Sequence, residues 1–289
     1  MLDRFDCYEL CVQSPRHVTA LLAAIHDNEP RVLQEDFCGT AAVSRRWVTE
    51  GEDRVAHAID LDDEVVAKAR MLVGAMPASE QRRLEIVQGD CITAGGPLEA
   101  TRRGVEQATP PASSLRGAVA HGSDVIFVGN FSIGYIAERG ALVAYLRACK
   151  RRLDAGNGGF GGGVFCCDLY GGASAFRLGA IERRHPSRGR EIIRYVWRHE
   201  AADPRTARVV NSISFRVEVD GEIVQELPRA FVYEWRLWSL SELTDAMREA
   251  GFGDVQVYKD LNIAPGQPAI AVQSAEELAE DWVVLVAAR

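Results

Sequence analysis

The chain has 289 residues, is 47% hydrophobic and carries a formal net charge of -8, with a pI near 5.4. This is ample for a core in one large or two small domains, and the composition excludes disordered and fibrous proteins. The acidic balance argues against nucleic-acid binding, because phosphate recognition needs clustered Lys and Arg. The densest basic stretch, residues 183–194, is interpreted as a solvated loop rim or a clamp for an anionic substrate.

Hydropathy and cysteine usage indicate a cytoplasmic protein. No residue run is apolar and long enough to cross a bilayer, and the first residues lack the apolar region of a signal peptide, so we expect no membrane association. The seven cysteines show no C-x-x-C spacing, although Cys7 and Cys11 lie one helical turn apart. Free, mostly buried thiols in a reducing compartment are the preferred interpretation, and no metal site is expected.

The first half of the chain alternates helix-like and strand-like segments. Apolar spacing predicts a helix within residues 3–28, with Ser14-Pro15 as a good helix start and Tyr8 on a short element just before it. Strands are predicted at 31–36, 55–60 and 84–88, and helices at 40–50 and 63–76. The Gly-, Pro- and Ala-rich residues 94–122 are interpreted as a surface excursion around one short helix.

The second half resumes the alternation and then changes character. Strands at 123–128 and 163–168 flank an amphipathic helix at 138–153. Apolar and polar residues then alternate in three pieces, 191–199, 208–219 and 222–237, and the pair Asp220-Gly221 is a strong hairpin signal. A helix starting at Ser239 or Ser241 and ending near Gly251 precedes strands at 255–258 and 282–286.

These elements predict an α/β fold: a doubly wound, Rossmann-like sheet with an inserted antiparallel β subdomain. We assign residues 1–178 and 237–289 to the Rossmann-like domain and residues 179–236 to the insertion.

Polar residues follow all five predicted parallel strands, at the edge where such sheets bind ligands. The first strand runs into Glu35-Asp-Phe-Cys-Gly-Thr-Ala41, where Gly39 permits close approach of a ligand to the backbone. The second strand ends in Asp60, whose carboxylate suits the two hydroxyls of a ribose. Gly89-Asp90-Cys91, Asn130-Phe131 and Asp168-Leu-Tyr170 end the remaining strands.

This ordered set resembles the motifs of class I S-adenosylmethionine-dependent methyltransferases. The likeness covers residues 31–170 and resumes at 239–286, where residues 238–252 resemble the family's late helix. It implies a seven-stranded sheet whose final strand is antiparallel. The insertion resembles the one that roofs the substrate pocket in small-molecule members, such as glycine and amino-sugar N-methyltransferases.

The resemblance also implies roles for particular residues. Glu35, Phe37 and Gly39 would lie at the methionine end of S-adenosyl-L-methionine, Asp60 and Leu61 at the ribose, and Asp90 and Cys91 at the adenine. Asn130 and Phe131 would contact the methionine moiety or the acceptor, and Tyr8 would belong to a lead-in segment closing over the cofactor. The sequence departs from the family where Phe37 and Ala41 replace glycines. Phe37 must therefore point away from the ligand or stack against it.

The predicted function is methyl transfer to a small-molecule acceptor, with Asp168, Tyr170 and Tyr135 as candidate catalytic residues. N-methylation is slightly favoured over O-methylation, because no His stands at a strand end to act as a base. His185 and His199 are interpreted as surface residues, and Tyr233, Trp235 and Trp238 as core. Two alternatives stay open: an NAD(P)-linked Rossmann oxidoreductase, although the G-x-G-x-x-G turn is lacking, and a non-catalytic ligand-binding protein on the same fold. Oligomeric state is open, a homodimer being one option.

Overall fold

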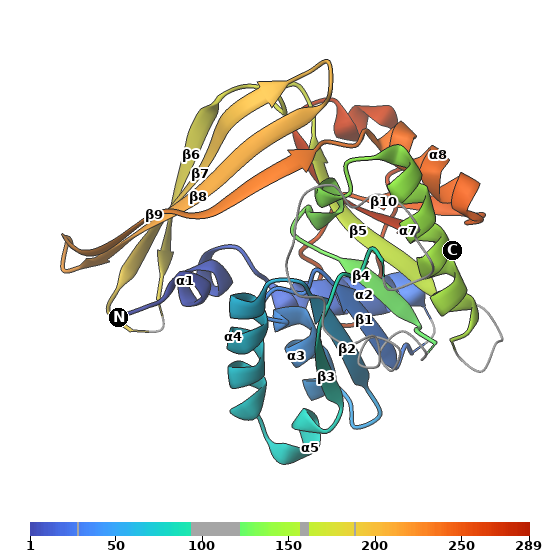
Figure 1. Ribbon diagram of the computed structural model, residues 1–289, viewed down its shortest axis with the longest axis horizontal. Helices are drawn as coiled ribbons and strands as arrows, with labels where there is room; N and C mark the ends of the chain where they lie inside the picture. Colours follow the sequence, from blue (N-terminus) through green and yellow to red (C-terminus); the bar gives the residue numbers. More distant parts are fainter. Residues whose placement is uncertain (28, 94–121, 157–161, 188) are drawn as a thin grey trace.

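The computed structural model describes residues 1–27, 29–93, 122–156, 162–187 and 189–289, and it contains two sheets (Figure 1). A seven-stranded sheet has the order β10-β11-β5-β4-β1-β2-β3, and a four-stranded sheet has the order β6-β7-β8-β9. The large sheet consists of β1 (Val32–Asp36), β2 (Val55–Asp60), β3 (Leu84–Gln88), β4 (Val125–Val128), β5 (Val164–Gly171), β10 (Val255–Tyr258) and β11 (Trp282–Ala288). This confirms the predicted Rossmann-like fold with an antiparallel insertion.

Strand order places the functional edge of the large sheet. Strands β1 to β5 pair in parallel, whereas β11 runs antiparallel to both β5 and β10. The chain moves outward from β1 through β2 to β3, and then returns to place β4 on the other side of β1. The carboxyl ends of β1 and β4 therefore flank the topological switch point, where open α/β sheets bind ligands.

Helices cover both faces of the large sheet because each carries one apolar stripe. Leu22 of α2 (Pro15–His26), Trp47 of α3 (Ala42–Thr49) and Ala69 of α4 (Asp63–Gly74) are buried in one core cluster. On the opposite face, Leu142 of α7 (Arg139–Asp154) and Leu243 of α8 (Leu240–Ala250) are buried in a second cluster. The shorter elements are α1 (Arg4–Cys11), α5 (Ala78–Gln81), η1 (Ser132–Tyr135) and η3 (Ala275–Leu278).

The small sheet is inserted between β5 and α8 and is amphipathic. It consists of β6 (Gly179–Pro186), β7 (Ile192–Asp203), β8 (Arg208–Val219) and β9 (Glu222–Arg236). Its inner face, which carries the buried Ile193, Ile213 and Phe215, packs against Cys7 of α1. The opposite face carries ion pairs such as Arg216 with Glu226, 3.0 Å apart. Period-two alternation in the sequence therefore gives the small sheet an apolar inner face, which packs against α1, and a charged outer face.

The structure confirms some predicted elements and corrects others. The helix start predicted at Ser14-Pro15 is the start of α2, and the short element that carries Tyr8 is itself a helix, α1. The insertion has four strands where three were expected, because β6 was missed. Of the basic stretch, Arg183, Arg184 and Arg194 lie in strands, whereas Arg190 lies in the bend between β6 and β7. Arg184, Arg190 and Arg194 pair with acidic neighbours, as Arg184 does with Glu218 at 3.0 Å, which argues against an anion clamp at these three residues.

Some expectations fall outside the described residues. Of the excursion predicted at residues 94–122, only residue 122 is among the described residues, so the short helix expected there is not tested. Across the described ranges, no helix combines the length and apolar character needed to cross a bilayer. The seven cysteines are all free, and six of them are buried, whereas Cys11 is half-buried.

Candidate functional site

The turn after β1 adopts the backbone of a glycine-rich loop with only one glycine. Phe37, Gly39 and Ala41 all have left-handed conformations, with φ of 55°, 56° and 57°. Left-handed backbone is costly for residues with a Cβ, so the surrounding contacts must hold it. A Cβ at Gly39 would meet no described atom within 4 Å, which leaves open space in front of this turn.

Asp60, at the end of β2, braces this turn. Its Oδ2 accepts a hydrogen bond from the Gly39 N–H at 2.8 Å, and its Oδ1 accepts one from the Asp62 N–H at 3.1 Å. Burial raises the pKa of Asp60 despite these bonds. The next residue, Leu61, is 66% exposed. An apolar side chain held in the open beside a carboxylate suits a nucleoside, which has an apolar ring face and a pair of hydroxyls.

Asp90 and Cys91, after β3, continue the same edge. Asp90 Oδ1 accepts the Ile92 N–H at 2.9 Å. Cys91 is buried with Ile59 and Val87, and the partly buried Phe37 packs against this cluster. Burial raises the pKa of the Cys91 thiol, and the nearby carboxylates of Asp36, Asp90 and Asp60 raise it further.

The two acidic residues of β1 point to opposite sides of the sheet, as neighbouring residues of a strand must. Glu35 is 4% exposed, and its Oε2 accepts the Ser44 N–H at 2.8 Å together with the Ser44 hydroxyl, which caps the first turn of α3. Burial raises the pKa of Glu35 to about 7. Asp36 is fully buried on the other side, where it accepts from Arg152 at 2.8 Å and from the Tyr145 hydroxyl at 2.6 Å.

Asp168 fixes the turn after β4. Its two oxygens accept the N–H groups of Asn130 at 2.9 Å and Phe131 at 2.6 Å, both residues being left-handed. Burial raises the pKa of Asp168 to about 7. With both oxygens engaged, this carboxylate positions the turn. Tyr170, two residues along β5, packs edge-on against Phe131, with ring centroids 4.9 Å apart.

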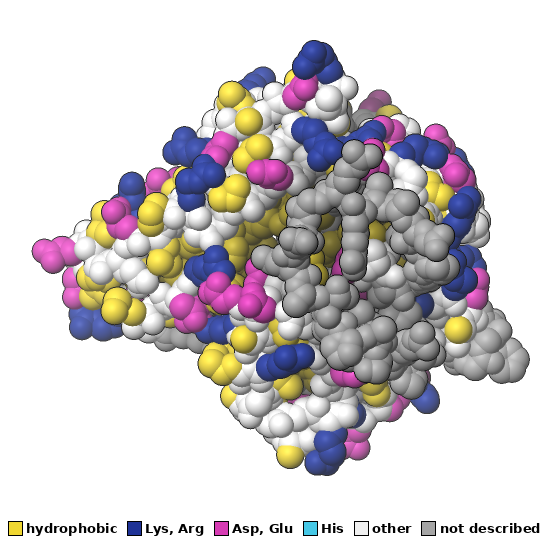
Figure 2. Space-filling model, viewed as in Figure 1, with side chains coloured by type: hydrophobic (Ala, Val, Ile, Leu, Met, Phe, Trp, Pro, Cys, Tyr) yellow, Lys and Arg dark blue, Asp and Glu magenta, His cyan; other side chains and the backbone are white. Residues whose placement is uncertain are grey.

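Tyr135, in η1, joins the strand ends to the small sheet. Its ring stacks on Phe37 at 6.1 Å and meets Trp235 of β9 edge-on at 5.9 Å. Tyr8, from α1, packs against Phe231 of β9 at 5.0 Å. Figure 2 shows apolar side chains gathered in the hollow between the small sheet and the large one.

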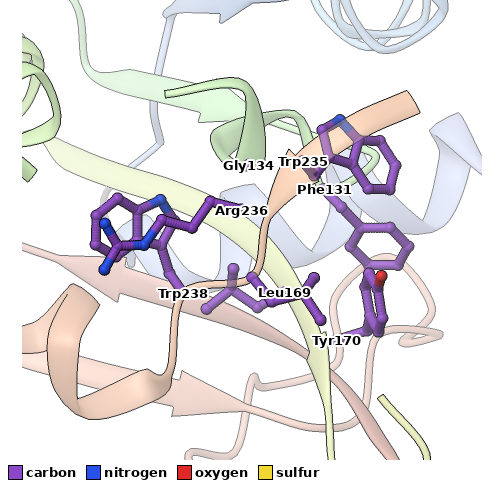
Figure 3. Close-up of a pocket in the computed structure, with 8 residues that line it drawn as sticks. Phe131, Gly134, Leu169, Tyr170, Trp235, Arg236 and Trp238 are labelled. Carbon is purple, nitrogen blue, oxygen red and sulfur yellow. The ribbon is translucent and has the colours of Figure 1, made fainter. Parts of the chain in front are cut away.

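A small crevice lies behind these rings, where β9 leaves the small sheet and leads into α8 (Figure 3). Phe131, Tyr170 and Trp235 stand together on one side of it, and Arg236 lies over Trp238 on the other. A Cβ at Gly134 would come within 2.8 Å of Trp235 Cβ, so only glycine lets η1 pack this closely against β9.

The strand-end residues predicted from the sequence thus gather at one edge, with two qualifications. Glu35 points toward α3, and Asp168 is bound by backbone amides. Trp235 is buried as predicted, whereas Tyr233 and His199 are half-buried. All three lie on the inner face of the small sheet, near Tyr135 and Tyr170. Their period-two spacing indicated that they share one face but not what that face covers. Trp238 is core as predicted, and its indole N–H donates to the Ile136 carbonyl at 3.1 Å.

Comparison with known proteins gives matches of structure only. The sequence matches no protein-family model and no curated protein. CalS10, an amino pentose methyltransferase from Micromonospora echinaspora solved with S-adenosylmethionine bound, is 12% identical with a TM-score of 0.63 over 100% of this chain and 98% of its own. The sugar N-methyltransferase KedS8 from a Streptoalloteichus species is 15% identical, with a TM-score of 0.61 over 99% and 93%.

A third match is the CcbJ methyltransferase from Streptomyces caelestis, which is 16% identical with a TM-score of 0.58 over 96% of each chain. Because the identities are this low, these matches show a shared fold and nothing finer. The chain therefore has the fold of S-adenosylmethionine-dependent methyltransferases.

Proposed function

We propose that this protein is an S-adenosylmethionine-dependent methyltransferase acting on a small molecule. The observation that carries the proposal is the carboxylate of Asp60, braced against the Gly39 turn beside the exposed Leu61, at the switch point of this fold. Fold alone does not decide function, but here the residues at the site have the chemistry that the ligand requires.

The residues fit the cofactor in an ordered way. Asp60 accepts hydrogen bonds from the ribose hydroxyls, Leu61 packs against the nucleoside, and Asp90 with Cys91 borders the adenine. The open space at Gly39 admits the methionine portion beside Phe37, Asn130 and Phe131. Glu35, which is bound to Ser44, supports this region through the first turn of α3. Tyr8, on α1, closes the site from the side of the small sheet.

S-adenosylmethionine supplies an electrophilic methyl group with its own leaving group, so the protein's part is chiefly to orient the reactants and exclude water. Positioning alone can lower the barrier by about 7–11 kcal/mol. Tyr135 and Tyr170 stand between the strand ends and the small sheet, where they would contact the acceptor, and Asp168 holds the Asn130–Phe131 turn that shapes this region.

The finer features of the proposal are an amine acceptor in preference to a hydroxyl, a cytoplasmic location and a small molecule in preference to nucleic acid. An amine needs only to arrive neutral, and no histidine stands at the carboxyl end of a parallel strand of the large sheet, as far as the structure describes it. The free thiols suit a reducing compartment, and the net charge of -8 disfavours a polyanion. Domain bounds of 1–178 with 237–289, and 179–236, follow the two sheets.

The oxidoreductase alternative loses support from topology. Dinucleotide-binding sheets have the order 3-2-1-4-5-6, whereas here the antiparallel β11 lies between β5 and β10. Thermal unfolding with S-adenosylhomocysteine, NAD⁺ or no ligand tests this directly. We expect S-adenosylhomocysteine to raise Tm and NAD⁺ to leave it unchanged. A rise in Tm with NAD⁺ and none with S-adenosylhomocysteine would overturn the proposal. Release of S-adenosylhomocysteine from S-adenosylmethionine in the presence of an acceptor then separates an enzyme from a non-catalytic binder.

A further inference from the structure

The turn after β1 is also held from the side of α1. Glu9 Oε1 accepts hydrogen bonds from the Thr40 hydroxyl and from Arg45 Nη2. Arg45 Nε in turn donates to the Thr40 carbonyl at 3.2 Å, so both the side chain and the backbone of Thr40 are engaged. Thr40 stands between Gly39 and Ala41, which are both left-handed. Glu9 and Arg45 therefore join α1 to α3 through the left-handed turn itself.

This contact differs from an ordinary ion pair on the surface. The side chains of Glu9 and Arg45 are 21% and 19% exposed, and Thr40 is 4% exposed. Water and salt screen a partly buried pair less than an exposed one, so its bonds stabilise the geometry more. Asp60 holds the same turn from the large sheet, through the Gly39 N–H at 2.8 Å. The turn is therefore fixed by one carboxylate of the large sheet and one of α1.

The apolar face of α1 is bound to the small sheet. Phe5 and Tyr8 both pack against Phe231 of β9, with ring centroids 5.9 Å and 5.0 Å apart. Cys7 is fully buried in the cluster on the inner face of that sheet. In Figure 1, α1 lies between the small sheet and the end of α4 that is nearest to it. The helix that carries Glu9 is therefore also part of the boundary of the acceptor side of the site.

Other ion pairs attach α1 to α4. Lys68 of α4 pairs with Asp3 at 2.6 Å and with Asp6 at 2.9 Å, at the start of α1. Arg4 pairs with Glu64 of α4 at 2.6 Å, and the Glu64 side chain is 64% exposed. These bonds fix α1 to α4 without touching the turn after β1. They therefore provide a matched comparison for a bond that does touch it.

Resting on the proposed function, we propose that Glu9 is a positioning residue through which α1 holds the turn after β1 ready for S-adenosylmethionine. With α1 in place, Glu9 fixes Thr40 and Arg45, and the turn presents its open side at Gly39 to the methionine portion. Without the bonds of Glu9, the turn keeps Asp60 but loses its support from α1, and cofactor binding weakens. Such coupling is reciprocal, so the bound cofactor in turn holds α1 in place.

The first test is calorimetric titration of variants with S-adenosylhomocysteine. Glu9→Leu and Thr40→Val should each raise Kd about tenfold, whereas Thr40→Ser, which keeps the hydroxyl, should stay within about twofold of wild type. Glu64→Gln, which removes another ion pair of α1, is the control and should bind as wild type does. The double variant Glu9→Leu/Thr40→Val should bind about as Glu9→Leu does, because both changes remove the same bond. An unchanged Kd in Glu9→Leu, or a double variant weakened about a hundredfold, overturns the proposal.

The second test measures the reverse effect, by hydrogen exchange of the backbone amides of residues 1–13. In wild type, saturating S-adenosylhomocysteine should slow this exchange by about the same tenfold factor, and in Glu9→Leu it should slow it much less. Equal slowing in both proteins, or none in wild type that binds the ligand, overturns the proposal. Failure of S-adenosylhomocysteine to bind wild type refutes the proposed function, whereas binding that is indifferent to Glu9 refutes only the present inference.

Discussion

Replacing Asp60 by Asn tests the proposed cofactor site with the smallest structural change. Asp60 Oδ2 and Oδ1 accept the N–H groups of Gly39 at 2.8 Å and Asp62 at 3.1 Å. Each carboxylate oxygen can accept about two hydrogen bonds, so both retain capacity for a ribose hydroxyl. Asn keeps one acceptor oxygen and puts an NH₂ group in place of the other, facing one of the two backbone donors.

The size of the effect follows from these bonds. A hydrogen bond to a charged group contributes about 1.5–3 kcal/mol and one to a neutral group about 0.5–1.5 kcal/mol. Loss of the charge together with one acceptor should therefore cost about 2–3 kcal/mol of binding free energy, which is about 30- to 150-fold in Kd. Burial raises the pKa of Asp60, so removing its charge should not by itself destabilise the fold.

Calorimetric titration with S-adenosylhomocysteine measures this loss directly. Asp245→Asn, on α8 with a side chain 69% exposed, is the matched control and should bind as wild type does. Thermal unfolding of each variant confirms that the folded state is being compared. A folded Asp60→Asn protein whose Kd lies within twofold of the wild-type value would refute the ribose role of this carboxylate.

Three further predictions concern stability. Arg152→Leu leaves Asp36 buried without its cation and should lower the free energy of unfolding by about 3–5 kcal/mol in urea titrations, and a loss below 1 kcal/mol would contradict a buried ion pair. Gly134→Ala should lower the free energy of unfolding by about 1–3 kcal/mol, because the new Cβ would lie 2.8 Å from the Cβ of Trp235. Gly74→Ala is the control and should be neutral or stabilising, because a Cβ there meets no described atom within 4 Å. Equal effects of the two substitutions would argue against close packing at Gly134. Burial raises the pKa of Glu35 to about 7, so the folded state favours the protonated side chain. The free energy of unfolding that this protonation contributes is fully present below about pH 4.5 and is lost as pH rises through 7. Glu35→Gln should therefore gain up to about 3 kcal/mol relative to wild type between pH 5 and pH 8.5, and a pH-independent difference would contradict it.

Local patterns in the sequence predicted most of the large sheet because each strand carries its own signal. The segments 55–60, 84–88 and 255–258 have the predicted bounds. β6 was missed because Gly179–Pro186 combines three charged residues and a histidine with a terminal proline, a composition tolerated only at the edge of a sheet, where β6 lies.

The sequence predicted which edge of the sheet carries the site, but not the direction in which each side chain points. Spacing along the chain brought Asp60 and Asp90 to one edge, yet it could not show that Glu35 would turn toward Ser44. Phe37 and Ala41 stand where the resembled family has glycines. Tertiary contacts impose on them the left-handed backbone that glycine adopts freely.

The role of the small sheet depended on contacts between distant segments. Alternation along β7 and β9 indicated a shared face for His199, Tyr233 and Trp235, but a strand pattern does not say what its apolar face covers. Only the packing of Tyr135 and Tyr170 against these residues shows that the face meets the strand ends rather than a separate core.

A crystal structure with S-adenosylhomocysteine bound is the most direct test of the central claim. The account predicts the ribose hydroxyls within hydrogen-bonding distance of the Asp60 carboxylate, the adenine beside Leu61 and Asp90, and the sulfur directed toward Tyr135 and the inner face of the small sheet. Electron density for the ligand at any other place, or a ribose that makes no contact with Asp60, would contradict it.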